Sequence, residues 1–300
     1  MDLNKETVRI QNLELLARQV VEGFITGLHK SPYHGFSVEF AEHRQYNTGE
    51  STRNIDWKLY ARTGRLYVKR FEEETNLRCQ LLLDVSSSMF YPNQKDNKLR
   101  FGVVAAASIM HLLRKQRDAV GLTVFHDAIV NHIPAKSSGS HHQLLLNELS
   151  NSYDTKSIQK STDVVAVLHE IAERIHKRSL VVIFSDMFDS GNEEVLFDAL
   201  QHLKFNKHEV VLFHIMDHDS EVNFDFEDRP YTFEDLESGE RVKLFPSEVK
   251  EQYTKEFNTF YTNLKNKCAQ YKIDFVNCDI SKSLDQVLLP FLVKRHKMRG

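Results

Sequence analysis

The 300-residue sequence predicts an α/β fold: a doubly wound, mostly parallel sheet, with an N-terminal helix-plus-strands extension. Three observations lead to this prediction. From residue 79 onward, short apolar runs alternate with segments of helical periodicity. Most of these runs are apolar throughout, which is typical of strands that are buried on both faces of a sheet. Residues 1–78 lack this alternation, so we expect 1–78 to form the extension and 79–300 the α/β domain.

The extension begins with a helical pattern over Glu6–Leu28, which Pro32 interrupts. Two strand-like runs follow, at Phe36–Phe40 and at Leu66–Phe71. The stretch between them, 44–65, is polar, and we assign no regular element to it.

Two patterns predict the elements of the α/β domain. Uninterrupted apolar runs predict strands, and apolar residues three and four positions apart predict helices. The clearest helix carries Val164, Leu168 and Ile171 on one face. In chain order we expect strand Gln80–Val85, helix Lys98–Lys115, strands Ala119–Phe125 and Ile129–Ile133, helices Ser140–Leu149 and Asp163–His176, strand Leu180–Phe184, helix Glu193–Leu203, strand Glu209–Ile215, helix Ser247–Tyr271, strand Ile273–Val276 and a last helix opened by Ser283.

An acidic insertion interrupts this alternation near 217–246. Its core, Asp217–Glu240, holds ten acidic residues and one basic residue, Arg229. The second half of the insertion, Tyr231–Leu244, predicts a hairpin with a glycine-containing turn.

The composition narrows the class of protein. Lys and Arg total 39 against 42 for Asp and Glu, so bulk charge gives no reason to expect nucleic-acid binding. No apolar stretch approaches the roughly 20 residues of a spanning helix, and the start of the chain does not have the pattern of a signal peptide. Cys79, Cys268 and Cys278 form no C-x-x-C pair and are expected to be reduced thiols. We therefore expect a cytoplasmic protein without a membrane span.

Polar side chains gather where two predicted strands end. Asp84, Ser86 and Ser88 occupy alternate positions at the end of the first strand, and Ser185 and Asp186 follow the strand at Leu180. A doubly wound sheet can bring these strand ends together. Carboxylate and hydroxyl oxygens suit Mg²⁺ or Mn²⁺ rather than Zn²⁺. The same residue types also form helix caps and turns, so spacing alone leaves a purely structural role open.

Two histidine-containing segments offer alternative sites. His169-Glu170-Ile171-Ala172-Glu173 resembles a zinc-protease helix, but Glu173 stands where the second histidine belongs. We expect this segment to be a solvated helix face. We also expect His141 and His142 to face solvent.

A basic run in the extension could suit nucleic acid, because aromatic residues are interleaved with it. The nearby acids Glu72–Glu74 favour pairing within the protein instead. The run contains Arg53, Lys58, Arg62, Arg65, Lys69 and Arg70, with Trp57, Tyr60 and Tyr67 among them.

Two motif sets resemble known families. Asp84-Val85-Ser86-Ser87-Ser88, with Thr162 and Asp186 downstream, resembles the metal-ion-dependent adhesion site (MIDAS) of von Willebrand factor A-type domains. The upstream motifs are similar to those of the bacterial domain-of-unknown-function-58 family, and the resemblance extends from Leu16 to the C-terminal helix. These upstream motifs are Gly35-Phe36-Ser37-Val38-Glu39-Phe40, Arg44-Gln45-Tyr46, Gly49, Arg53-Asn54-Ile55-Asp56-Trp57, Ala61-Arg62-Thr63-Gly64-Arg65-Leu66-Tyr67-Val68-Lys69 and Phe71-Glu72.

The resemblance implies a von Willebrand A-like, Rossmann-like domain that acts as an adaptor of a MoxR-type AAA+ ATPase in protein-complex maturation or stress response. Ser86, Ser88 and Thr162 would be direct metal ligands, and Asp84 and Asp186 would bind directly or through water. The sequence departs from the adhesion-site pattern at two positions. Ser161 precedes Thr162 where glycine is common, and Met187 follows Asp186 where glycine is usual.

We therefore expect a non-enzymatic interaction module, in which a carboxylate from an acidic client completes a Mg²⁺ or Mn²⁺ site. No G-x-S-x-G or P-loop motif is present, so ATPase activity would come from the partner. The alternatives are a metal-dependent phosphohydrolase using Asp84 and Asp186, and a purely structural scaffold. In the phosphohydrolase, Ser86 would stand where D-x-D enzymes carry a general acid, and a hydroxyl is a poor acid.

Overall fold

The computed structural model describes residues 12–21, 40–46, 55–71, 77–93, 96–154, 164–187, 193–236, 239–288 and 290. The chain divides into two compact units. The smaller unit is Tyr33–Asn76, and the larger one combines Met1–Pro32 with Leu77–Gly300.

The smaller unit contains an antiparallel pair of strands, β1 (Phe40–Gln45) and β2 (Tyr67–Phe71), with helix α2 (Trp57–Thr63) between them in the chain. The Asp56 carboxylate caps α2 by accepting from the backbone N–H groups of Lys58 and Leu59, each at 3.0 Å. Gly64 ends the helix in the left-handed conformation, at φ +66°. The predicted strand at Leu66–Phe71 corresponds to β2, whereas Phe36–Phe40 lies outside the described residues apart from Phe40 itself.

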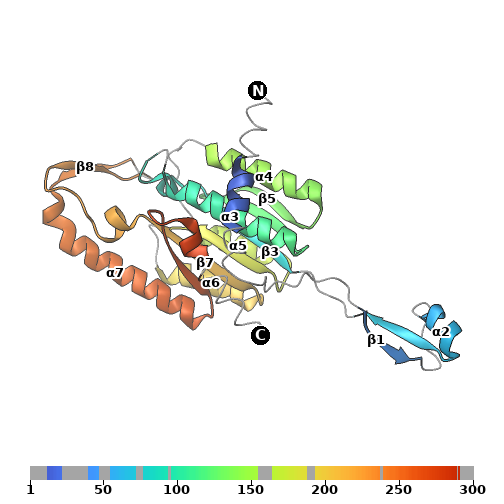
Figure 1. The fold of residues 1–300 in the computed structure, drawn as a ribbon. Coiled ribbons are helices and arrows are strands. Elements are labelled where there is room, and N and C mark those ends of the chain that lie inside the picture. The colour runs from blue at the N-terminus through green and yellow to red at the C-terminus, as the bar shows by residue number, and fades with distance from the viewer. Residues whose placement is uncertain are drawn as a thin grey trace. The chain divides into compact units, whose positions relative to one another are not determined.

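The larger unit is built on a six-stranded sheet in the order β10-β7-β6-β3-β4-β5 (Figure 1). Five strands are parallel, and β5 pairs antiparallel with β4 at one edge. This arrangement confirms the predicted mostly parallel α/β sheet. The strands are β3 (Arg78–Asp84), β4 (Ala119–Phe125), β5 (Ile129–Lys136), β6 (Leu180–Ser185), β7 (Glu209–Met216) and β10 (Asp274–Asp279).

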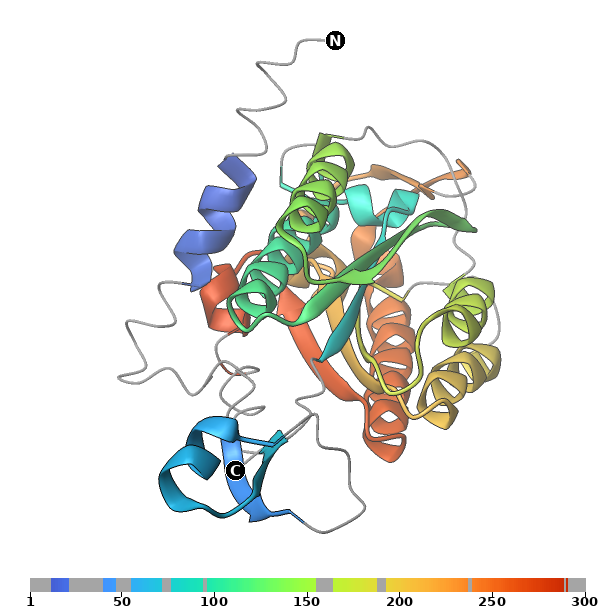
Figure 2. The ribbon, with the colours of Figure 1, turned by 90° about the vertical axis from the view of Figure 1, so that its right-hand side faces the viewer.

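Helices cover both faces of this sheet (Figures 1 and 2). They are α3 (Lys98–Lys115), α4 (Gly139–Asp154), α5 (Val164–Arg174), α6 (Glu193–Phe205) and α7 (Pro246–Gln270). A further helix at 12–21 lies within the predicted Glu6–Leu28 segment, and a short helical turn spans 284–288. The bounds of α3 and β4 match the sequence-based expectation, and the other strands of the sheet begin and end within a few residues of theirs. Helix α4 extends beyond the predicted Ser140–Leu149, to Asp154.

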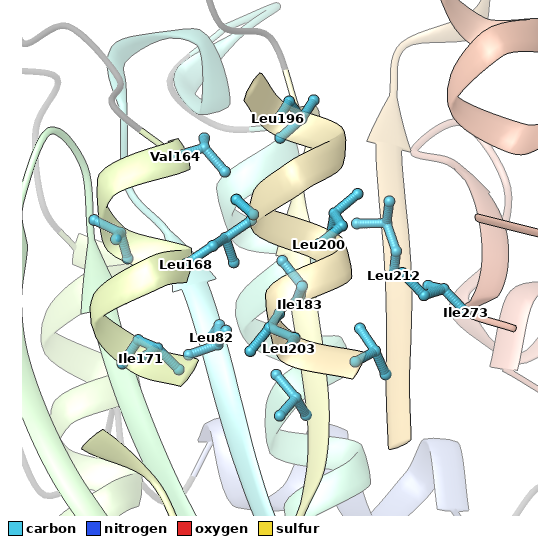
Figure 3. Close-up of a cluster of buried hydrophobic side chains, with 14 of the residues drawn as sticks. Leu82, Val164, Leu168, Ile171, Ile183, Leu196, Leu200, Leu203, Leu212 and Ile273 are labelled. Atoms are coloured by element: carbon cyan, nitrogen blue, oxygen red, sulfur yellow. The ribbon is translucent and has the colours of Figure 1, made fainter. Parts of the chain in front are cut away.

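Successive side chains along each strand point to opposite faces of the sheet, so the core has two layers. Leu82, Ile183 and Leu212 are fully buried on the face that α5 and α6 cover (Figure 3). Leu264 of α7 belongs to the same cluster. The neighbouring residues on the strands point the other way, toward α3. A Cβ added to Gly102 of α3 would lie 3.2 Å from the Ile215 side chain, so α3 approaches the sheet closely there.

The acidic insertion contains the predicted hairpin, formed by β8 (Tyr231–Glu234) and β9 (Arg241–Leu244). Aromatic contacts link it to α7. Phe224 stacks on Phe233 at a ring-centroid distance of 5.8 Å and contacts Tyr253 at 4.6 Å. The described part of the insertion therefore packs against α7 of the larger unit.

One expectation about α4 is wrong. His141 and His142 are only 8% and 7% exposed, because the first turn of α4 packs inward. The ring Nε2 of His141 lies 2.9 Å from the Val120 carbonyl oxygen and donates to it. None of the described helices is both long enough and apolar enough to cross a membrane.

Candidate functional site

The candidate site lies at the carboxyl ends of β3 and β6, where the winding of the sheet changes direction. β3 is followed by β4 on one side, and the later strand β6 pairs with its other side. Open α/β sheets bind ligands at such switch points. Asp84 is the last residue of β3, and Asp186 directly follows β6.

Asp84 is fully buried and is hydrogen-bonded to Ser86 and Ser185. Its Oδ1 accepts from the Ser86 backbone N–H at 2.9 Å, and its Oδ2 accepts from the Ser185 hydroxyl at 2.6 Å. Burial, and then the charge of Asp186, raises the pKa of Asp84 to about 7. Burial and the neighbouring negative charge therefore favour the protonated form, and the ionised carboxylate retains lone pairs for further contacts.

Ser86 and Ser88 begin the turn that follows β3. Ser86 has extended backbone angles immediately before the 3₁₀ helix Ser87–Phe90, so its side chain stays at the strand end. The two hydroxyl oxygens, Oγ of Ser86 and Oγ of Ser88, lie 3.1 Å apart. Ser86 is fully buried and Ser88 is partly exposed, so this pair connects the interior of the site with its surface.

A buried lysine, not singled out by the sequence, completes the site. Lys98 Nζ lies 2.6 Å from Oδ2 of Asp186 and 2.6 Å from Oε1 of Glu221. Burial alone lowers the pKa of Lys98, but the two carboxylates outweigh burial and raise it above its ordinary value. One sequence signal could have indicated this role, because a cation in the first turn of a helix opposes the helix dipole and needs an acidic partner.

Glu221 brings the acidic insertion into the site. It belongs to the short helical turn His218–Val222, and its second carboxylate oxygen accepts from the Asp217 backbone N–H at 2.8 Å. Burial raises the pKa of Glu221 despite the charge of Lys98. One residue of the insertion therefore contacts the sheet-edge cluster directly.

Met187 adopts a backbone conformation that normally favours glycine. Its φ is +54°, in the left-handed region, and its side chain is fully buried. The Met187 N–H donates to the Ser185 hydroxyl oxygen at 2.8 Å, and that hydroxyl in turn donates to Asp84. The sequence departs from the adhesion-site pattern at Met187, but the left-handed turn is present there.

The structure thus brings together most of the residues that the sequence indicated. Asp84, Ser86 and Ser88 gather at the end of β3, and Asp186 follows the neighbouring strand. Thr162 lies outside the described residues. Across the described part of the chain, no group of three or more His, Cys, Asp or Glu side chains could hold a metal ion.

The donor chemistry nevertheless fits a hard divalent cation that binds mainly through hydroxyls. Asp84 and the two serine hydroxyls supply oxygen donors, which Mg²⁺ and Mn²⁺ prefer. A cation beside Asp84 would favour the ionised carboxylate and so oppose the effects of burial and of Asp186 that raise its pKa. Lys98 partly neutralises Asp186, so that carboxylate is the weaker candidate for direct ligation.

Comparison with known proteins identifies the family. Residues 42–263 match the family described as "Protein of unknown function DUF58", and the chain belongs to this family. The uncharacterized proteins Mb1516 of Mycobacterium bovis and Rv1480 of Mycobacterium tuberculosis are each 24% identical to this chain over 217 residues. Each alignment covers 72% of this chain and 67% of the relative.

Two solved structures are similar at lower identity. The conserved hypothetical protein BatB from Bacteroides thetaiotaomicron is 15% identical with a TM-score of 0.47. An aerotolerance-related membrane protein from Bacteroides fragilis is 14% identical with a TM-score of 0.41. Each comparison covers 74% of this chain and 100% of the solved chain.

Proposed function

We propose that the protein is a metal-dependent protein-interaction module with no catalytic activity of its own. Asp84, Ser86 and Ser88 would hold Mg²⁺ or Mn²⁺ at the sheet edge, with Thr162 and Asp186 as further ligands, directly or through water. The observation that carries the proposal is the buried Asp84 carboxyl beside the Ser86–Ser88 hydroxyl pair at the switch point.

Charge explains why such a site would recruit a partner. Asp186 and Glu221 share the Lys98 ammonium, and the two serine donors are neutral. An ion held mainly by hydroxyls keeps most of its positive charge. A carboxylate from an acidic client is therefore a favourable further ligand, because Mg²⁺ prefers oxygen donors and usually keeps exchangeable waters.

The proposal extends to the fold type and the partner. The sheet order and the strand-end serines support a von Willebrand A-like domain, and the resemblance described above supports a MoxR-type AAA+ ATPase as partner. The protein would act as the adaptor that connects this ATPase to its client. A cytoplasmic setting suits the three buried cysteines, which are free thiols.

The phosphohydrolase alternative has less support. Its nucleophile would be Asp84, whose raised pKa leaves much of the carboxyl protonated near neutral pH and hence less nucleophilic. Its general acid would have to be replaced, because Ser86 occupies the position of the second aspartate.

Metal titration and partner capture test the proposal together. We expect isothermal titration calorimetry to detect Mn²⁺ binding by the full chain, and its loss in Asp84→Asn and Ser86→Ala. Asp285→Asn, an exposed carboxylate remote from the site in sequence, is the matched control and should bind as the wild type does. Capture from native lysate should then recover an AAA+ ATPase or an acidic client in Mg²⁺ but not in EDTA.

Two outcomes of these experiments would contradict different parts of the proposal. Equal recovery of the same partners in Mg²⁺ and EDTA would remove the metal mechanism while keeping the adaptor role. Turnover of a generic phosphate ester that is lost in Asp84→Asn would overturn the non-catalytic assignment.

A further inference from the structure

Two histidines from neighbouring helices face each other away from the sheet-edge site. His169 on α5 and His202 on α6 place their Nδ1 atoms 2.9 Å apart. The segment His169–Glu173 lacks a second histidine on its own helix, and the fold supplies one from α6. The pair therefore arises from tertiary packing, which the sequence pattern of α5 cannot reveal.

The packing beneath the pair fixes the positions of both helices. Leu168 of α5 and Leu200 and Leu203 of α6 are fully buried in one cluster (Figure 3). The Asn206 side-chain amide also donates to the Ala172 carbonyl oxygen at 2.8 Å, which connects the end of α6 to α5. The two imidazoles are thus held by a rigid base, as a preorganised site requires.

Glu173 determines how the protons are arranged. Its Oε1 lies 2.8 Å from Nε2 of His202, and an ionised carboxylate can only accept a hydrogen bond. Nε2 of His202 therefore carries a proton, and in the neutral ring Nδ1 has a free lone pair directed at His169. The proton between the two neutral rings therefore lies on Nδ1 of His169, which donates to Nδ1 of His202.

We propose that His169 and His202 form a second metal site, specific for a transition-metal ion such as Zn²⁺ that prefers imidazole nitrogen. The ion would bind both Nδ1 atoms while the proton on Nδ1 of His169 moves to Nε2 of the same ring, and Glu173 would orient His202 from outside. A carboxylate on the far nitrogen of a ligating histidine is a general feature of zinc sites. This site is chemically distinct from the oxygen-donor site at the sheet edge and does not depend on it.

The geometry needs only a small adjustment. Zn²⁺ binds histidine nitrogen at about 2.0–2.1 Å, which places two nitrogens of a tetrahedral ion about 3.3 Å apart. The observed separation of 2.9 Å would widen slightly. No group of three protein ligands of the His, Cys, Asp or Glu type is present among the described residues, so water would complete the coordination.

Solvent and ions can reach this position. The His202 side chain is 27% exposed and that of Glu173 is 69% exposed. His202 also lines a surface hollow of about 570 Å³, together with Lys204, Phe205 and Tyr271 among others. An ion with open coordination positions could therefore exchange water or accept an outside ligand.

Zinc titration of the full chain tests the proposal, with Mg²⁺ in excess throughout so that oxygen-donor sites are saturated. We expect calorimetry to detect one Zn²⁺ whose binding is lost in His169→Ala and in His202→Ala. Glu173→Gln, at an exposed position, should weaken binding by about 10–100-fold. His176→Ala removes an exposed histidine near the end of α5 and should leave binding unchanged.

A measurement on the wild type guards against misfolded variants. Adding Zn²⁺ should shift the Nδ1 resonances of two histidines in nitrogen-detected NMR, and both rings should then carry a protonated Nε2. Absence of Zn²⁺ binding by the wild type would overturn the proposal. Binding that survives in both His169→Ala and His202→Ala would also overturn it, by placing the ion elsewhere.

Discussion

Lys98 Nζ donates to Oδ2 of Asp186 across 2.6 Å, while the two side chains are only 0% and 1% exposed. The same ammonium contacts Glu221, so one cation connects the strand end after β6 with the acidic insertion. A lysine is almost never buried so completely without such partners. The positive charge of Lys98 is therefore a structural requirement of this edge of the sheet.

Replacing Lys98 by Met should strongly destabilise the fold. The substitution roughly keeps the length of the side chain but leaves the buried Asp186 carboxylate and the mostly buried Glu221 carboxylate without the Lys98 cation. Breaking a buried ion pair in this way costs about 3–5 kcal/mol of the free energy of unfolding. Urea unfolding of the larger unit measures the loss. Lys115→Met, at an exposed position of the same helix, is the control and should change stability by no more than about 0.5 kcal/mol.

Asp84→Asn should stabilise the metal-free protein in a pH-dependent way. The pKa of Asp84 rises from 3.8 to about 7 on folding, so the folded state binds this proton more tightly. Between these pH values stability must fall as pH rises, and the cost above pH 7 is on the order of 4 kcal/mol. Urea unfolding in EDTA at pH 5 and pH 8 measures this effect. The free energy of unfolding of the variant, relative to that of the wild type, should be larger at pH 8 than at pH 5. A difference that does not change with pH would contradict this assignment.

His142 should make the protein sensitive to acid. Burial and the nearby Arg114 lower the pKa of His142 from 6.5 to about 4. The unfolded chain therefore binds the proton first, so the stability present above pH 6.5 is lost as pH falls toward 4. His142→Gln should flatten the fall in the unfolding temperature between pH 7 and pH 4.5. His176→Gln, at an exposed position, should leave that fall unchanged.

Leu168→Ala should reveal how much the layer formed by α5 and α6 contributes to stability. Leu168 is fully buried, so truncation removes apolar contacts and leaves a cavity. The expected loss in the free energy of unfolding is about 2–5 kcal/mol. Leu144 on α4 is 50% exposed, and Leu144→Ala should cost far less in the same denaturant titration. Equal effects at the two positions would mean that burial does not govern stability here.

The sequence predicts the elements of the larger unit well because its periodicities are strong. α3 carries small and apolar residues on a wide face, and β4 is bounded by Asp118 and by the turn after Phe125, so both ends are marked. Helix α2 escapes prediction because it buries none of its seven residues and therefore has no apolar stripe. Its only signals are the caps, Asp56 and Gly64.

Some residues of the candidate site could likewise be predicted from the sequence, and others could not. Asp84, Ser86 and Asp186 follow apolar strands directly, so their gathering at one edge follows from parallel strand order. The roles of Lys98 and Glu221 could not be predicted, because their contact spans 123 positions and depends on how the insertion folds back. The pairing of His169 with His202 likewise depends on the packing of two helices.

The hydrogen bond from Ser185 to Asp84 joins residues 101 positions apart. During synthesis, β3 therefore emerges long before β6, and one edge of β3 lacks its partner strand until residue 185 has been made. An incomplete chain can carry the serines of the site but cannot place Asp186 beside them. A partner that contacts both strand ends would thus distinguish a chain in which β3 has paired with β6 from an earlier nascent one, and binding would be reserved for molecules in which this pairing is complete.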